Sequence, residues 1–302
     1  MVTSGLTARE VPEARQDIID WASRTRGQGA DRMRPGFANM VATNAVHADL
    51  YYVNRDMTAL ARTIGAGLDV YGLSRDDLPS EHGFLVWDAP AASNELPQTV
   101  SVAVLWFTYR GQVALTLMGS ADAYRTWAAG FGPQAVRDAR LITAGKLTLR
   151  GQATNLPVDQ SDRPWGTLDL GDFEKTARTL LATWILMRQP AEERRALHQV
   201  EEVLPAKASA KRIARAGGDP TSPVRLITLR QSLRRDDAAT TAESHAERVY
   251  RHRWIVRPHR VRQHYPSTGE HRTIWRGPYL VVPKGCEDAP IIGGERVNVL
   301  RR

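Results

Sequence analysis

Residues 248–279 contain a dense group of side chains that can contact phosphate or transfer protons. Eight arginines fall in this segment against one acid, Glu270, and tyrosines and tryptophans are interleaved among them. Half of the chain's eight histidines also lie here, at His252, His259, His264 and His271. Nowhere else in the chain do residue types and spacing point as directly to chemistry.

The mixture of arginines and aromatic rings favours nucleic acid. A guanidinium group can bind phosphate through two hydrogen bonds, and a tyrosine or tryptophan ring can stack on an exposed base for about 1–3 kcal/mol. The alternative is structural: the arginines form a solvated face, and Trp254 and Trp275 pack across neighbouring strands. The residues predicted to contact nucleic acid are Arg251, Arg253, Arg257, Arg260, Arg262, Arg272, Arg276, Trp254, Tyr265 and Trp275.

A sharper hypothesis is metal-independent cleavage of RNA. This reaction needs a base for the 2′-hydroxyl proton, an acid for the leaving oxygen and a cation for the charged transition state. Histidine can fill the first two roles near neutral pH. The candidate catalytic residues are His259 and His271 on opposite arms of a hairpin, together with Arg257, Arg272 and Tyr265.

Metal and cofactor sites are not predicted. The four histidines, separated by 7, 5 and 7 residues, do not match a common zinc pattern even with Cys286 included. The glycines at 65 and 67 do not belong to a phosphate loop, because no GxxxxGKS or GxxxxGKT sequence follows them. We therefore expect neither a metal nor a cofactor.

The positive charge is concentrated at one end of the chain. Residues 1–204 hold 21 basic and 24 acidic side chains, a net charge of −3, whereas residues 205–302 hold 20 basic and 9 acidic ones, a net charge of +11. An asymmetry of this kind indicates that the C-terminal part faces a polyanion.

The elements that would support this segment predict an α+β fold. Apolar residues at helical spacing predict helices over 11–22, 57–70, 121–130 and 172–189. A second helix, beginning after Pro190 and continuing to Leu204, would form a helical hairpin with the last of these. Runs of β-branched and aromatic residues predict three antiparallel strands, over 84–87, 99–109 and 112–118, with Arg110 and Gly111 as the turn of a hairpin. Residues 151–171 are predicted to be an extended loop.

The C-terminal part is expected to form a small basic module. A short basic segment follows Pro205, residues 224–229 form a strand, and residues 236–247 resemble a linker. Beyond it, alternation predicts a β-hairpin with arms at 250–257 and 272–275, with Pro258 interrupting its ladder. The expected division is a body of unknown role at 1–205, a basic segment, strand and linker at 206–247, and a basic aromatic hairpin at 248–302.

Three stretches carry a resemblance: LPSEHGFLVWDAP (79–91), LLATWILMRQP (180–190) and RHRWIVRPHRVRQHYPSTGEHRTIW (251–275). In these the chain resembles a group of uncharacterised proteins of actinobacteria, their phages and mobile elements. The resemblance implies a setting in phage or plasmid biology and no activity. The group has Gly where Pro258 stands and Trp where Arg260 and His264 stand, which favours His259 and His271 over the other histidines.

Composition excludes some classes of protein. The longest predominantly apolar runs, 100–107 and 180–187, are eight residues with one Ser or Thr each, too short to cross a bilayer. No secretory signal is visible, so we expect a cytoplasmic protein without a membrane partner. The sequence favours a nucleic-acid-binding protein whose C-terminal hairpin contacts the phosphates of RNA or DNA. Its expected setting is regulatory or associated with a mobile element. The alternatives are a toxin-like ribonuclease and an assembly factor whose N-terminal body binds a protein partner.

Overall fold

The structure is a computed structural model of the chain. It describes residues 4–25, 36–92, 100–160, 162–189, 197–229, 252–265, 269–283, 285–286, 289 and 291–292. These residues form a mixed α+β fold, as the sequence predicts. None of the helices in these ranges is long and apolar enough to span a membrane.

An eight-stranded mixed sheet forms the centre, in the order β6-β7-β5-β4-β3-β1-β10-β9. The parallel neighbours β1, β3 and β10 lie inside it, and antiparallel strands continue to both edges. The strands are β1 (Asp49–Val53), β3 (His82–Trp87), β4 (Ala103–Tyr109), β5 (Gln112–Ser120), β6 (Thr143–Ala144), β7 (Leu147–Pro157), β9 (His198–Val203) and β10 (Val224–Leu229).

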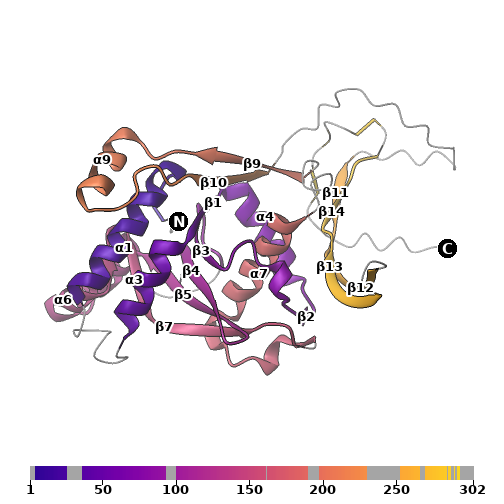
Figure 1. Cartoon of the computed structure of the whole chain (residues 1–302), viewed down its shortest axis with the longest axis horizontal. Coiled ribbons are helices and arrows are strands. Elements are labelled where there is room, and N and C mark those ends of the chain that lie inside the picture. The colour runs from indigo at the N-terminus through magenta and orange to yellow at the C-terminus, as the bar shows by residue number, and fades with distance from the viewer. Residues whose placement is uncertain are drawn as a thin grey trace.

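Helices cover both faces of this sheet (Figure 1). On one face lie α1 (Val11–Thr25) and α3 (Phe37–His47), and on the other α4 (Arg55–Ala66) and α7 (Glu174–Arg188). Strand β1 is buried on both sides for this reason: Tyr51 and Val53 belong to the core under α4 and α7, while Leu50 and Tyr52 belong to the core under α1 and α3. The remaining helices are α5 (Ala121–Ala129), α6 (Pro133–Leu141) and α9 (Lys207–Arg215).

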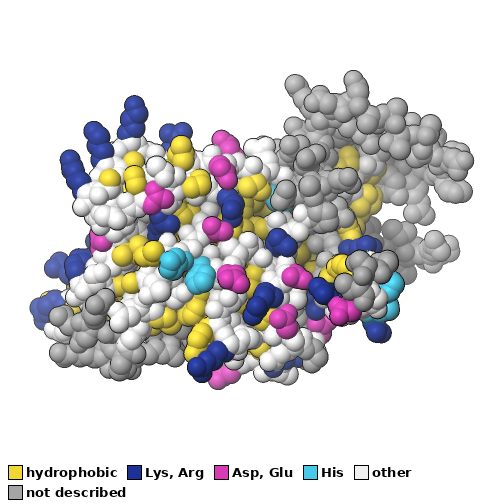
Figure 2. Space-filling model, in the orientation of Figure 1, with side chains coloured by type: hydrophobic (Ala, Val, Ile, Leu, Met, Phe, Trp, Pro, Cys, Tyr) yellow, Lys and Arg dark blue, Asp and Glu magenta, His cyan; other side chains and the backbone are white. Residues whose placement is uncertain are grey.

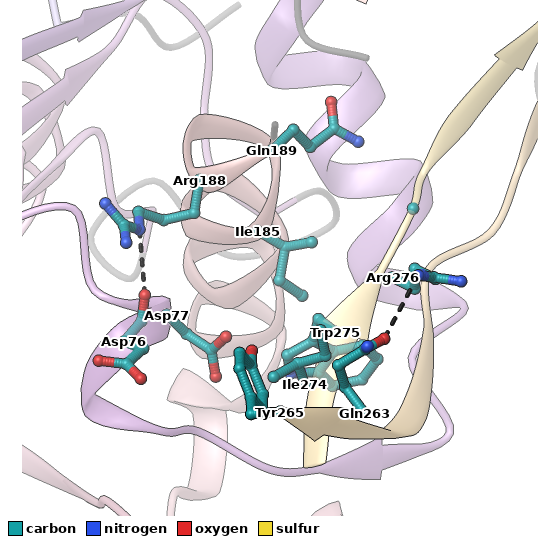
Figure 3. A pocket seen from close by; sticks show the side chains of 11 residues that line it. Asp76, Asp77, Ile185, Arg188, Gln189, Gln263, Tyr265, Ile274, Trp275 and Arg276 are labelled. Atoms are coloured by element: carbon teal, nitrogen blue, oxygen red, sulfur yellow. Dashed lines mark hydrogen bonds between the residues drawn. The ribbon is translucent and has the colours of Figure 1, made fainter. Parts of the chain in front are cut away.

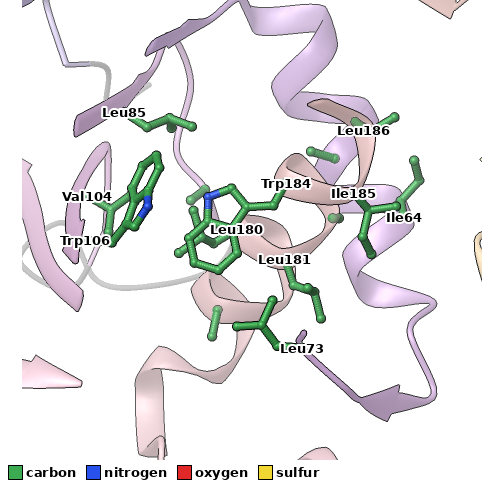
Figure 4. Close-up of a cluster of buried hydrophobic side chains, with 14 of the residues drawn as sticks. Ile64, Leu73, Leu85, Val104, Trp106, Leu180, Leu181, Trp184, Ile185 and Leu186 are labelled. Carbon is green, nitrogen blue, oxygen red and sulfur yellow. The ribbon is translucent and has the colours of Figure 1, made fainter. Parts of the chain in front are cut away.

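Large aromatic rings fill the core beneath α7 (Figure 4). Trp184 of α7 meets Trp106 of β4 edge to face, with ring centroids 5.4 Å apart. Gly83 in β3 makes room for this packing, because a Cβ there would lie 2.1 Å from Cζ2 of Trp106. The predicted β4–β5 hairpin is confirmed, and its turn residues Arg110 and Gly111 both have positive φ angles, 47° and 72°.

Two predicted elements differ from the structure. The second helix, expected to continue to Leu204, ends earlier: Leu197 is helical, but His198–Val203 form strand β9, which pairs antiparallel with β10. The free edge of β10 offers backbone hydrogen bonds that a helix could not use. Likewise, residues 151–157 of the predicted loop belong to β7, which pairs with β5.

The body continues beyond the boundary predicted at residue 205. Helix α9 packs on α1, and β10 lies between β1 and β9 in the central sheet. These contacts join residues up to Leu229 to the body. The expected linker at 236–247 lies outside the described residues.

The C-terminal region contains a basic hairpin whose second arm is close to the predicted one, but whose first arm is residues 259–265 and not the predicted 250–257. The hairpin consists of β12 (His259–Tyr265) and β13 (Glu270–Arg276). Strand β11 (Arg253–Val256) pairs instead with β14 (Tyr279–Val281) and β15 (Ile291–Ile292). Pro258 lies between β11 and β12, as its missing N–H predicts.

Candidate nucleic-acid interface

The β12–β13 hairpin is anchored to the body at the end nearest β11 and β14. Trp275 Nε1 donates a hydrogen bond of 2.8 Å to the carbonyl oxygen of Gly72, and its ring packs against the main core. Ile255 of β11 is buried in the same core, and Gln189 at the end of α7 donates to the carbonyl oxygen of Pro278. Packing and hydrogen bonds therefore both hold the hairpin on the body.

Arg260 also belongs to this anchor. Its guanidinium lies 3.0 Å from the Asp162 carboxylate and 3.7 Å from Asp77, and only 12% of the side chain is exposed. The same group lies over the Trp275 ring, 5.3 Å from its centroid. Arg260, predicted to contact nucleic acid, is instead occupied with carboxylates and an aromatic ring of the protein itself.

Two further predicted residues have structural positions. Arg253 is 2% exposed and its Nε donates to the carbonyl oxygen of Ala289 at 2.6 Å, so it is not available to phosphate. Trp254 is half-buried opposite Val281 and meets the His252 ring edge to face. Trp254 and Trp275 are not cross-strand partners, because they belong to different strand pairs. Arg251 lies outside the described residues.

Beyond the Arg260–Trp275 pair, towards the turn, the same face of the hairpin is exposed. Side chains alternate along each strand, and residues opposite each other share a face. By this register Arg262 lies opposite Thr273, and His264 lies opposite His271. All four are exposed, and the two histidine rings have centroids 4.7 Å apart. We call these four residues the open face; it contains no carboxylate.

The structure does not bring His259 and His271 together. His259 pairs with Arg276 and His271 with His264, so the two histidines are five positions apart along the ladder, roughly 17 Å at the usual strand rise. They also lie on opposite faces. The Arg257 guanidinium packs against Gly67 at the end of α4, so it is directed at the body and not at His271. The predicted catalytic set is therefore not one site.

The other face of the hairpin forms one wall of a cleft of about 410 Å³. Figure 3 shows the cleft between the hairpin, the end of α7 and the turn η2 (Arg75–Asp77). The lining residues are Asp76, Asp77, Ile185, Arg188, Gln189, Gln263, Tyr265, Ile274, Trp275, Arg276 and Gly277.

Aromatic and charged groups share this cleft. Arg272 lies over one side of the Tyr265 ring, 5.6 Å from its centroid, and forms ion pairs with Glu270 at 3.1 Å and Asp76 at 3.8 Å. Arg276 is exposed and donates a long hydrogen bond of 3.4 Å to Gln263. Tyr265 and Arg276, both predicted from the sequence, thus line a pocket rather than a flat surface.

Asp77 is the buried carboxyl of the cleft. Burial raises its pKa, although hydrogen bonds from the Ser74 backbone and hydroxyl, and the charge of Arg260, act in the opposite direction. Both bonds from Ser74 go to Oδ2, at 2.8 and 2.9 Å. Oδ1 accepts no hydrogen bond from the residues that the structure describes, so it can accept one from a bound molecule.

Other charged groups lie elsewhere. Across the described ranges, no cluster of three or more His, Cys, Asp or Glu residues is arranged to hold a metal ion. Lys207, Lys211 and Arg215 form an exposed row on α9 with one-turn spacing. Figures 1 and 2 place α9 and its basic side chains at the opposite end of the long axis from the hairpin. The row and the hairpin are therefore separate surfaces.

Comparison with protein-family models, curated proteins and solved structures gives no match to this chain. Function is therefore inferred from the residues and their geometry.

Sequence reasoning missed the body's half of the cleft. Asp76 and Asp77 lie in a polar turn and Arg188 ends the apolar helix α7, and only the fold brings them to one cleft with Tyr265. One available signal was the pair of adjacent acids, Asp76 and Asp77, after Arg75. By itself that pair predicts only a solvated turn or a helix start.

Proposed function

We propose that this protein binds nucleic acid through the β12–β13 hairpin. The observation that carries the proposal is the open face, where Arg262 and the His264–His271 pair are exposed together with no carboxylate among them. Cations on such a surface attract phosphates and can donate charge-assisted hydrogen bonds to them.

The anchor of the hairpin supports the same proposal. Arg260 and Trp275 hold the hairpin against the body before any ligand arrives. A rigid ribbon loses less conformational freedom on binding than a flexible basic tail. Arg260 and Arg253 accordingly stabilise the position of the C-terminal strands. Direct contact with phosphate is assigned to Arg262 and Arg276.

A salt titration tests the proposal. Fluorescence anisotropy with single-stranded RNA, single-stranded DNA and duplex DNA should show binding at low ionic strength. The logarithm of the association constant should fall linearly with the logarithm of salt concentration, by about 0.7 per phosphate contact on a single strand. Absence of binding at the lowest salt, or binding that salt leaves unchanged, would contradict the proposal.

The ribonuclease alternative keeps one specific observation in its favour. Two imidazoles 4.7 Å apart, with Arg262 on the same face, supply a proton donor, a proton acceptor and a cation, although the pair is His264 and His271 rather than His259 and His271. RNA incubated with the protein in chelator distinguishes the two functions. Cleavage that is lost in both His264→Ala and His271→Ala supports the enzyme, whereas intact RNA supports binding alone.

A further inference from the structure

We propose that the cleft behind the hairpin holds one unstacked nucleobase of a bound single strand, a base that carries an exocyclic amino group. This inference rests on the proposed function and adds a substrate class to it: single-stranded RNA or DNA rather than a duplex. Three properties of the cleft carry it.

The first property is an aromatic wall with one side open to a ligand. Arg272 occupies one side of the Tyr265 ring, at 5.6 Å. Figure 3 shows the ring pointing into the space between the hairpin and α7, with Ile185 and Ile274 nearby. A flat heterocycle can stack on a tyrosine ring and contact aliphatic side chains around it. Trp275 is less suited to stacking, because its indole is fixed by Gly72 and Arg260.

The second property is a hydrogen-bond acceptor beside that wall. The Asp77 carboxyl points into the same space in Figure 3, and its Oδ1 accepts no bond from the described residues. An exocyclic amino group of adenine, cytosine or guanine can donate to a carboxylate oxygen. Thymine and uracil present carbonyl oxygens in place of that amino group and would meet the carboxylate unfavourably.

The third property is the balance of charge. Asp76 and Asp77 line the cleft together with Arg188 and Arg276, so the cleft has no net charge from these four groups. Arg188 is exposed and uses its Nε to donate to the Asp76 carbonyl oxygen, which leaves its other N–H groups for solvent or ligand. A neutral ring suits such an interior better than a phosphate does, and the phosphates can remain outside near Arg276.

Size and position are consistent with one base. The volume of about 410 Å³ is near the lower end of the usual range for ligand pockets, roughly 300–1,000 Å³. The cleft and the open face are the two sides of a ribbon only two strands wide, with strands about 4.8 Å apart. A single strand whose phosphates follow the open face can therefore turn one base around the edge of the ribbon.

An abasic oligonucleotide tests the inference on the full chain. Binding of a cytosine oligomer is compared with that of a fully abasic oligomer of equal length and charge and with that of a thymine oligomer. The wild-type protein should bind the cytosine oligomer about tenfold more tightly than the abasic one. Tyr265→Ala should remove this preference, and Tyr265→Phe, which keeps the ring, should retain it.

Each outcome bears on one proposal in particular. Equal affinity for the cytosine and abasic oligomers overturns the base pocket and leaves phosphate binding intact. Equal affinity for cytosine and thymine oligomers overturns the role assigned to Asp77. Failure to bind any of the three at low salt contradicts the proposed function itself. Because the comparison of oligomers uses the wild-type protein, it does not depend on whether a variant folds.

Discussion

The arginines of the C-terminal segment differ in what their side chains contact. Arg253 is buried against the backbone at Ala289, and Arg260 is held by Asp77 and Asp162. Within the part of the chain that the structure describes, Arg262 forms no ion pair, and Arg276 donates a long hydrogen bond to Gln263. Residue type alone does not distinguish these cases. What separates them is where each residue lies along the strands and what the body presents there: Arg260 and Arg262 share one face of the hairpin, but only Arg260 lies against the body.

At this scale we predict that Arg262→Gln weakens nucleic-acid binding by one phosphate contact. The slope of the salt dependence should become shallower by about 0.7 for a single strand, since one fewer counterion is released. The measurement is anisotropy at several salt concentrations. Arg215→Gln is the matched control, because it removes the same charge from the exposed end of α9 at the far end of the molecule. Equal effects of the two variants would argue against a localised interface.

Helix α1 shows how an element can carry a destabilising group. Glu13 pairs with Arg212 and Ser209 of α9, whereas Asp17 is half-buried beside Gly145. Burial, followed by the negative charges of Glu13 and Asp20, raises the pKa of Asp17 to about 6. In the unfolded chain an aspartate titrates near 3.9. Folding therefore becomes less favourable as pH rises through that interval.

Asp17→Asn should consequently stabilise the protein at neutral pH. Below about pH 4 the carboxyl is protonated in both states, and no penalty exists. Between about pH 4 and pH 6 the unfolded state loses its proton first, so stability falls, and the penalty persists above pH 6. Allowing for partial exposure, the variant should gain about 1–2 kcal/mol at pH 7.5 and little at pH 4. Urea unfolding at both pH values measures this; an equal gain at the two would contradict the explanation.

Strand β9 illustrates a limit of prediction at the level of elements. Leu197, Val200 and Val203 are compatible with a helical stripe, which is why the sequence predicts a helix there. In the structure Val200 is 42% exposed and pairs with Ile227 at the edge of the sheet. The open edge of β10 decides between the two, and it belongs to a distant part of the chain.

In the whole molecule, the hairpin depends on the body for its orientation. Trp275 is the main link, since it combines a hydrogen bond to Gly72 with packing against the core and against Arg260. The cleft exists only while this link holds, because one wall belongs to the hairpin and the other to α7 and η2.

Trp275→Ala should loosen the hairpin without unfolding the central sheet. Amide hydrogens of β12 and β13 should exchange roughly tenfold faster or more. In the variant the Trp275 contacts with the body are already absent, so local opening of the hairpin does not have to break them. Amides of β4 and β5 should retain their protection. Hydrogen exchange read by mass spectrometry measures both. Trp127→Ala on α5 is the control, and faster exchange of the hairpin in that variant, or slow exchange in Trp275→Ala, would contradict this role.

The sequence by itself determined the local features of this protein. Helical and alternating patterns placed α1, α7 and the β4–β5 hairpin, because each depends on the chemistry of neighbouring residues. Clustered arginines and aromatics indicated the basic C-terminal segment, which includes Tyr265 and Arg276, although they predicted the wrong first arm for its hairpin. Tertiary structure alone decided which arginines are buried, which histidines face each other and where a cleft opens. These features depend on strand register and on contacts such as Trp275 with Gly72, which join residues 203 positions apart.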